Sequence, residues 1–355
     1  MGQFPEKQSV QLAIVPVKEE NNVVTLAMRE PLVEGQAMVL KQIFGGRTVQ
    51  PVLCRPSNIE FIRSRGYPRL VLPPSRLEPV LGRFQQASGA DADKFFEALI
   101  STHSTRRALA DVLLDRGMID ESIARKLWAD VVGCPAWETK EFSFDRGAYD
   151  KLGAGFWWLH RMLPAGNGKV ISGVAPHPQV AALLDQKLGK TTILAELPGK
   201  LELAGRAAGV GFDADQRLVD RLVADGVLKK NVIPDVAEFR GLIADPIPKW
   251  LQVQKLVTEE QLNHALIAIS GLPAAAAWSS DEAFRLATIL RPGFANEFGI
   301  YPLEEKNGAI RLGLSQMPVA ETVQALYDRL AGYALSFEAL NLADVRKLSD
   351  MMAGQ

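Results

Sequence analysis

One local pattern occurs three times in this sequence, and it constrains the possible fold more than any other feature. Each copy has two apolar runs joined by Asn-Gly or Asn-Asn, then a proline, an amphipathic run ending at glycine, and a third apolar run. The copies span residues 15–53, 162–195 and 301–337. Because asparagine and glycine accept the positive φ angles of a two-residue turn, each pair predicts a β-hairpin. Proline in a first helical turn and glycine past a helix end predict a helix before the third strand. The sequence therefore predicts a repeated strand–strand–helix–strand unit.

A helical segment is predicted before the second and third copies, and it repeats at a constant spacing. The offset from Pro135 to Pro273, for example, equals the offset from Pro164 to Pro302. Thr258 and Gln261 form a predicted capping box at the start of one helix, and Asp120 is predicted to cap the equivalent helix.

Further upstream the sequence predicts a different spacing. Gly89–Asp93 resembles Gly211–Asp215, and the offset between these two stretches is smaller than the offset from Pro135 to Pro273. This shift predicts that the third unit carries about 16 more residues over this stretch than the second, or roughly four helical turns.

These repeats predict an α+β fold built from units. Residues 1–75 form a truncated αβ half-unit, and residues 76–208 and 209–355 form two full units. Each full unit is expected to contain a helical subdomain and a small mixed sheet with helices. Since no helical segment precedes the first hairpin, we expect the chain to begin inside a repeat, as a C-terminal piece of a longer protein.

Composition narrows the classes of partner and compartment. Forty basic and 41 acidic residues leave a net charge of −1, so no global field attracts nucleic acid. No apolar run reaches the ~18 residues of a membrane span, so we expect no direct membrane insertion. The two cysteines, Cys54 and Cys134, are far apart and are expected to be buried, reduced thiols. The protein is therefore predicted to be cytoplasmic.

The sequence offers no catalytic constellation, so we expect a protein that is not an enzyme and has no cofactor. Gly189–Thr192 resembles the end of a phosphate-binding loop, but Leu184 occupies the position of its first glycine. The Asp-x-Asp pairs at Asp91 and Asp213 resemble metal-binding pairs of sugar-nucleotide transferases, yet both open predicted helices, where aspartate caps free amides. Trp157-Trp158 could stack on a ligand ring, but core packing is the favoured interpretation.

One motif points to a family. Arg217–Leu228 has the form Arg-Leu-x-x-x-Leu-Val-x-x-Gly-x-Leu, and Leu256–Leu262 follows downstream. A related form lies at Arg107–Ile119. Together with the later Gly-x-Pro and the Pro-led hairpin, these residues resemble the N-terminal domain of type II secretion and pilus-assembly ATPases, also called the MshEN domain. The resemblance covers most of residues 90–345, whereas residues 1–75 resemble only its αβ half.

In that family, tandem copies of the motif bind cyclic di-GMP, so the resemblance implies this nucleotide as a possible ligand. Leucines would form an apolar platform for guanine, arginine would pair with phosphate, and glycine would admit the ligand backbone. The residues implied are Arg217, Leu218, Leu222, Gly226, Gln261 and Leu262 in the third unit, and Arg107, Leu109, Leu113 and Gly117 in the second.

The motif also departs from the family pattern. Val219 and Ala110 replace its first glycine, Pro246–Pro248 replaces Arg-Leu-Gly in the tandem partner, and Lys255 replaces the later glycine. The third unit keeps the arginine in register and is therefore expected to be the better site.

The same domain also occurs as the cytoplasmic tail of membrane glycosyltransferases of the bacteriophage-adsorption type, which help to make a surface glycan. By this analogy we expect a non-catalytic regulatory and interaction region of an exopolysaccharide synthesis and export system. Its partner would be a membrane glycosyltransferase or an export protein. The alternative is a scaffold without a ligand that docks a type II secretion or polysaccharide machine.

Overall fold

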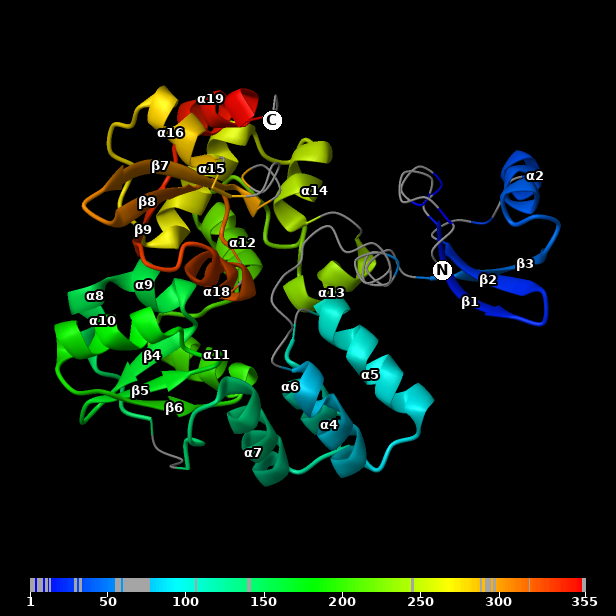
Figure 1. Ribbon diagram of the computed structural model, residues 1–355, viewed down its shortest axis with the longest axis horizontal. Coiled ribbons are helices and arrows are strands. Elements are labelled where there is room, and N and C mark those ends of the chain that lie inside the picture. Colours follow the sequence, from blue (N-terminus) through cyan, green and yellow to red (C-terminus); the bar gives the residue numbers. More distant parts are fainter. Residues whose placement is uncertain are drawn as a thin grey trace.

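The computed structural model describes residues 14–28, 34–54, 77–105, 107–138, 142–243, 246–287, 298–318 and 320–352, with residues 4, 9, 12, 31, 59, 289, 290 and 295. Three mixed sheets of three strands, each accompanied by helices, give the α+β class that the sequence predicts (Figure 1). The strands are β1 (Ile14–Glu20), β2 (Val23–Met28), β3 (Thr48–Leu53), β4 (Met162–Ala165), β5 (Lys169–Ser172), β6 (Thr192–Ala195), β7 (Ile300–Lys306), β8 (Ala309–Leu314) and β9 (Ala334–Ala339).

Each sheet begins with the predicted hairpin. Both central residues of the first turn, Asn21 and Asn22, have positive φ angles of 49° and 63°. Asn307 and Gly308 adopt 54° and 74° in the third turn. Two successive positive φ angles give the turn the twist that a tight antiparallel pair needs. The hairpin predictions are confirmed.

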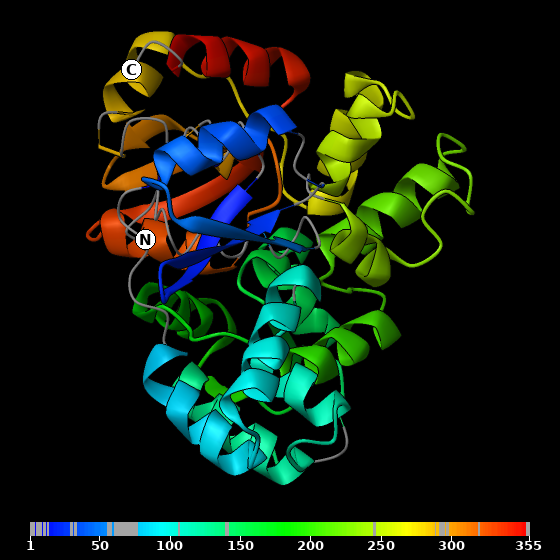
Figure 2. The same ribbon diagram turned by 90° about the vertical axis from the view of Figure 1, so that its right-hand side faces the viewer.

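The third strand of each sheet runs parallel to the second and is reached through a helix. The helices are α2 (Glu34–Ile43), α10 (Pro178–Leu188) and α18 (Ala320–Arg329). A parallel pair requires such a crossover connection, because a tight turn cannot join its ends. In the first unit, α2 lies over one face of its sheet (Figure 2). The predicted order of strand, strand, helix and strand is therefore confirmed in all three sheets.

The first and third sheets match residue for residue. All three strands and the helix of the third sheet lie at one constant offset from those of the first. Both hairpins also carry a register shift directly after a proline, Pro16 in β1 and Pro302 in β7. The hairpin of β4 and β5 is shorter and pairs continuously from Met162 to Ala165.

A group of helices opens each of the last two units. Before the second sheet they are η1 with α4 (Glu78–Val80 and Leu81–Ser88), α5 (Ala92–Thr105), α6 (Leu109–Asp115) and α7 (Glu121–Val132). Before the third they are α12 (Ala214–Ala224), α13 (Val236–Leu242), α14 (Ile247–Val253) and α15 (Glu259–Ser270). We call these two groups the second and third helical halves.

The predicted change of spacing between the helical halves is wrong. The offset from α6 to α14 equals that from α7 to α15 and that from Pro135 to Pro273, so the constant spacing extends upstream. The aspartates that suggested a shift open different helices. Asp91 accepts a hydrogen bond from the amide of Lys94 at α5, whereas Asp213 accepts one from the amide of Gln216 at α12. A helix cap is a local signal, and it does not say which helix it starts. The third helical half therefore has no insertion of four turns.

The helix caps themselves are partly as expected. Thr258 and Gln261 form the predicted capping box at α15. Asp120 occupies the cap position of α7, but its side chain accepts no capping hydrogen bond. Gly189 ends α10 in place of a phosphate-binding loop. Cys54 and Cys134 are not joined in a disulfide, and both are half-buried rather than buried.

The second and third sheets share one hydrophobic core. Met162 and Ile171 of the second sheet belong to the same buried cluster as Leu312 and Tyr327 of the third unit. Trp157 and Trp158 lie in this cluster, with exposed fractions of 1% and 3%, which confirms core packing. Further helices in the described ranges are α8 (Arg146–Leu152), α9 (Ala154–Leu159), α11 (Pro198–Ala207), α16 (Ser280–Ala287) and α19 (Leu342–Met352).

Two further expectations concern the ends of the units. The boundary at 75/76 falls outside the described residues, and the boundary at 208/209 lies between α11 and α12, where it stays a prediction.

Over the part of the chain that the structure describes, none of the helices is both long and apolar enough to cross a bilayer.

Candidate functional site

The motif leucines of the third helical half lie inside the protein. Leu218 and Leu222 on α12 are 1% and 0% exposed and pack in the cluster formed by α12 to α15. Leu262 on α15 belongs to the same cluster. Spacing of three to four residues places such side chains on one helix face, and here that face forms the core. These leucines are not available as a surface platform for guanine in this conformation.

Arg217 is turned inward as well. Its guanidinium donates hydrogen bonds to the backbone carbonyls of Gly211 and Ile269, the latter at the C-terminal end of α15. Burial lowers the pKa of Arg217 from its usual value. A half-buried cation with neutral acceptors is a group that an anion could recruit, because phosphate makes stronger, charge-assisted bonds than a carbonyl does.

The remaining residues of the third motif do not converge on Arg217. Gln261 is exposed, and its side chain forms the capping box with Thr258. Gly226 follows α12 with a φ of 70°, and nothing lies within 4 Å of the position that a Cβ would take. The structure therefore brings Leu218, Leu222 and Leu262 together and leaves the polar members apart.

The second helical half repeats this arrangement. Leu109 and Leu113 on α6 are 1% and 0% exposed, within the cluster of α4 to α7. Arg107 is exposed and forms an ion pair with Asp115 at 2.5 Å. Gly117 has a φ of 64° and open space beside it. The leucines are again core residues, whereas Arg107 and Gly117 remain accessible.

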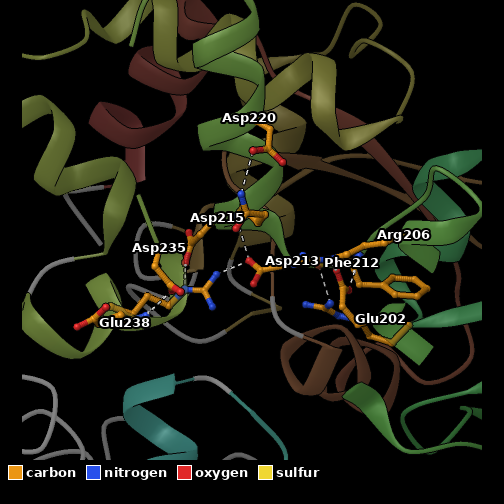
Figure 3. Close-up of polar contacts among 11 residues, drawn as sticks. Glu202, Arg206, Phe212, Asp213, Asp215, Asp220, Asp235 and Glu238 are labelled. Carbon is orange, nitrogen blue, oxygen red and sulfur yellow. Dashed lines mark hydrogen bonds and ion pairs between the residues drawn. The ribbon is translucent and has the colours of Figure 1, made fainter. Parts of the chain in front are cut away.

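A cluster of buried ion pairs surrounds the start of α12 (Figure 3). Arg240 on α13 bonds to both Asp213 and Asp215, with 2.7 Å from its Nε to Asp215 Oδ2. Only 9% of the Arg240 side chain and 7% of that of Asp215 are exposed. Burial raises the pKa of Asp213, but the charge of Arg240 and its hydrogen bond outweigh burial and lower it. Sequence reasoning missed Arg240, because no local pattern links it to aspartates 25 and 27 residues away.

The segment just before α12 joins this cluster to the second unit. Arg161, between α9 and β4, donates from Nη1 to the Phe212 carbonyl at 2.6 Å. Glu202 on α11 accepts from the Phe212 amide at 2.6 Å and from Arg206 Nε at 2.8 Å. Glu202, Phe212 and Asp213 lie close together in Figure 3. The cluster thus fixes α12 against the sheet-containing half of the second unit.

The other acidic and histidine candidates take part in structural contacts. Asp91 and Asp213 both accept amide hydrogen bonds at helix starts. Within the described ranges, no three His, Cys, Asp or Glu side chains group as metal ligands. His160 is buried in the core, and this burial lowers its pKa to about 3, so its ring is neutral.

A family model matches the N-terminal end of the chain. Residues 1–69 match the family model of the MshEN domain. Among solved structures, that of MshE with cdg, which is cyclic di-GMP, aligns with 38% of this chain and 98% of that chain, at 18% identity and a TM-score of 0.31. No curated protein matches the chain. The family match supports the predicted resemblance to the MshEN family over residues 1–69. The matched residues do not include α6, α12 or α14, the helices that carry the motif.

Proposed function

We propose that this chain is a regulatory and interaction region of a bacterial glycan synthesis and export system, located in the cytoplasm, and that it senses cyclic di-GMP. The match of residues 1–69 to the MshEN domain carries the proposal. The same strand–strand–helix–strand order recurs in the later two sheets, which supports extending the family likeness to them. The partner would be a membrane glycosyltransferase or an export protein, and the chain itself would not catalyse a reaction.

For the ligand, we propose a site at the start of α12 in the third unit. Arg217 would exchange its bonds to the Gly211 and Ile269 carbonyls for bonds to a phosphate. Since Ile269 belongs to α15, this exchange would loosen α12 from α15. Binding would thus be linked to the packing of the helical half, which is how a regulatory domain could signal.

Calorimetric titration of the full chain with cyclic di-GMP tests this site. We expect Arg217→Ala to weaken binding by about 10- to 150-fold, or roughly 1.5–3 kcal/mol, for the loss of charge-assisted bonds. Arg221→Ala is the matched control, because Arg221 lies one turn along the same helix and pairs with Asp225 at the surface. Its affinity should equal that of the unchanged chain. Binding that survives Arg217→Ala would place the site elsewhere.

A second candidate, a scaffold without a ligand, is favoured by the buried leucines of both motifs. Leu113 and Leu222 are 0% exposed, and Pro246 and Lys255 interrupt the tandem motif. The absence of any heat or fluorescence change at tens of micromolar cyclic di-GMP would support the scaffold. Partner association measured with and without the nucleotide should then be identical.

The proposal also expects no turnover of ATP or nucleotide sugars by this chain. Leu184, which stands in the position of the phosphate-loop glycine, is 0% exposed inside α10. Asp213 is held by Arg240. Assays of purified chain with each substrate provide the measurement. Turnover that disappears in Lys190→Ala or Asp213→Ala would show the chain to be an enzyme.

A further inference from the structure

Arg161 has a backbone conformation that is unfavourable for its residue type. Its φ angle is 51°, in the left-handed region that glycine adopts easily and other residues adopt at a cost. The equivalent residue of the third unit is Gly299, with a φ of 62°. Each of the two residues immediately precedes the first strand of its sheet, and its carbonyl accepts from the residue after the second strand, Gly173 or Ser315. A strained position of this kind is often found where the side chain has a function.

The side chain of Arg161 lies over two aromatic rings. Its Cζ atom is 5.3 Å from the ring centre of Trp158 and 5.7 Å from that of Phe212. Trp158 belongs to α9 of the second unit, whereas Phe212 directly precedes the residue that caps α12. The Trp158 ring also carries a buried Nε1–H that has no hydrogen-bond partner within the described part of the chain. A buried donor without a partner is uncommon, and it is a group that a ligand acceptor can satisfy.

Arg161 and Arg217 bond to successive carbonyls of one segment. Arg161 Nη1 donates to the Phe212 carbonyl at 2.6 Å, and Arg217 Nη1 donates to the Gly211 carbonyl at 3.4 Å. Consecutive Cα atoms are only about 3.8 Å apart. The two guanidinium groups, one from each unit, are therefore held beside the same short stretch of backbone.

These two arginines concentrate positive charge at the junction of the units. Burial lowers the pKa of Arg217, and the charge of Arg161 lowers it further. Tyr149 and Glu202 act on this pKa in the opposite direction. The Glu202 carboxylate, however, is already bonded to Arg206 Nε at 2.8 Å. A phosphate would add negative charge beside both arginines and would accept stronger, charge-assisted bonds than a carbonyl does.

We propose that Arg161 is the second arginine of the phosphate site at Arg217, so that one phosphate of the ligand is held between the second and third units. This inference rests on the cyclic di-GMP binding proposed above. Different oxygens of the phosphate accept from the two guanidinium groups and replace the carbonyls of Gly211 and Phe212. Since Arg161 belongs to the second unit and Arg217 to the third, the bound ligand contacts both units directly.

Calorimetric titration of the full chain with cyclic di-GMP tests this role through three variants of Arg161. Arg161→Met removes the charge but keeps an unbranched side chain over the two rings, so it should raise Kd by at least about 10-fold. Arg161→Gly introduces the residue of the third unit and is a second neutral variant that should bind as weakly. Arg161→Lys restores a positive charge without the planar guanidinium and should recover part of the loss. Thermal unfolding confirms that the variants fold.

A matched arginine provides the control. Arg146 also lies over an aromatic ring, 5.7 Å from the ring centre of Tyr149, but it pairs with Asp150 at the surface. The Kd of Arg146→Met should equal that of the unchanged chain.

Salt dependence separates a contact with the ligand from a structural role. Arg161→Met should bind with an affinity that depends less steeply on salt concentration than that of the unchanged chain, because one pair of opposite charges is lost. Weaker binding with the same salt dependence would overturn this inference. So would binding that Arg217→Ala weakens and Arg161→Met leaves unchanged, and the proposed function would then still stand. Absence of binding by the unchanged chain would overturn the proposed function and this inference with it.

Discussion

The second and third helical halves share their helices but differ at the positions that the family motif stresses. Leu109 and Leu113 on α6 have the apolar counterparts Ile247 and Leu251 on α14, which lie at the constant offset between the two halves and are also buried. Gly117, in contrast, has the counterpart Lys255. Positions that fill the core stay apolar, whereas exposed positions vary. The comparison teaches that the leucines of the motif serve the helical core first, whatever else the motif does.

The two helical halves also differ in the partners of their buried charged side chains. The third buries Arg240 between Asp213 and Asp215. The second buries Asp111, whose Oδ2 accepts from the Gly199 amide at 2.8 Å. One half thus relies on an ion pair, and the other on a single carboxylate bonded to backbone.

The largest expected difference lies in this buried ion pair. Arg240→Ala leaves two carboxylates without their counter-charge, so we expect the unfolding free energy to fall by about 3–5 kcal/mol. Arg83→Ala is the control in the second half, since Arg83 and Asp130 form a surface pair with side chains 50% and 44% exposed. Its cost should stay within about 1 kcal/mol. Denaturant unfolding measures both, and equal costs would mean that the Arg240 cluster contributes no more than a surface pair.

Truncation of the equivalent leucines Leu113 and Leu251 should lower the unfolding free energy by similar amounts. Leu113→Ala and Leu251→Ala each remove a side chain that is 0% exposed, and each should lower the unfolding free energy by about 2–5 kcal/mol. The exposed Leu203 on α11 serves as a control whose truncation should cost far less. A small loss at Leu113 alone would separate the two halves and favour a ligand-facing role for that residue.

Acid should weaken the third half more than the second. The pKa of Asp213 is lowered because Arg240 outweighs burial, so its stabilisation exists above the unfolded value of about 3.9 and is lost as pH falls through the folded value. Burial raises the pKa of Asp111, and the Gly199 hydrogen bond only partly offsets this. Its folded state therefore favours the protonated carboxyl and gains relative stability as pH falls. Hydrogen exchange between about pH 6 and pH 3, corrected for intrinsic rates, should show α12–α15 losing protection before α4–α7. A parallel loss in both would contradict this assignment.

The smallest effect concerns the residue that ends α14. Lys255 adopts a φ of 55°, a left-handed conformation that is unfavourable for residues with a side chain and favourable for glycine. The equivalent residue of the second half is Gly117, with a φ of 64°. Lys255→Gly should raise the unfolding free energy by about 0.5–1 kcal/mol, after the entropy that glycine adds to the unfolded chain. Gly117→Lys should have the opposite sign. Thermal unfolding of the two variants decides whether these positions are equivalent.

The sequence predicted the sheets well because their signals are local. Asn21, Asn167 and Asn307 each mark a turn whose geometry depends on two residues, and the strands follow from the turn. The helical halves were harder. Asp91 and Asp213 are equally good caps, yet they start helices that do not correspond, so local similarity gave a false register. Arg240 is determined by tertiary packing and has no local signature. The motif leucines show apolar periodicity, which identifies a buried face and does not distinguish a core from a ligand site.

The shared core of the second and third sheets has a consequence for how the protein unfolds. Side chains from β4 and β5 are buried against those of β8 and α18, so neither sheet can lose its packing without exposing the other. Because the two units share this buried apolar surface, their unfolding transitions are coupled. We expect these two units to melt in one cooperative step, although their sequences read as separate repeats. Among the described residues, the buried side chains of the first sheet form clusters of their own, so we expect this sheet to unfold in a separate step.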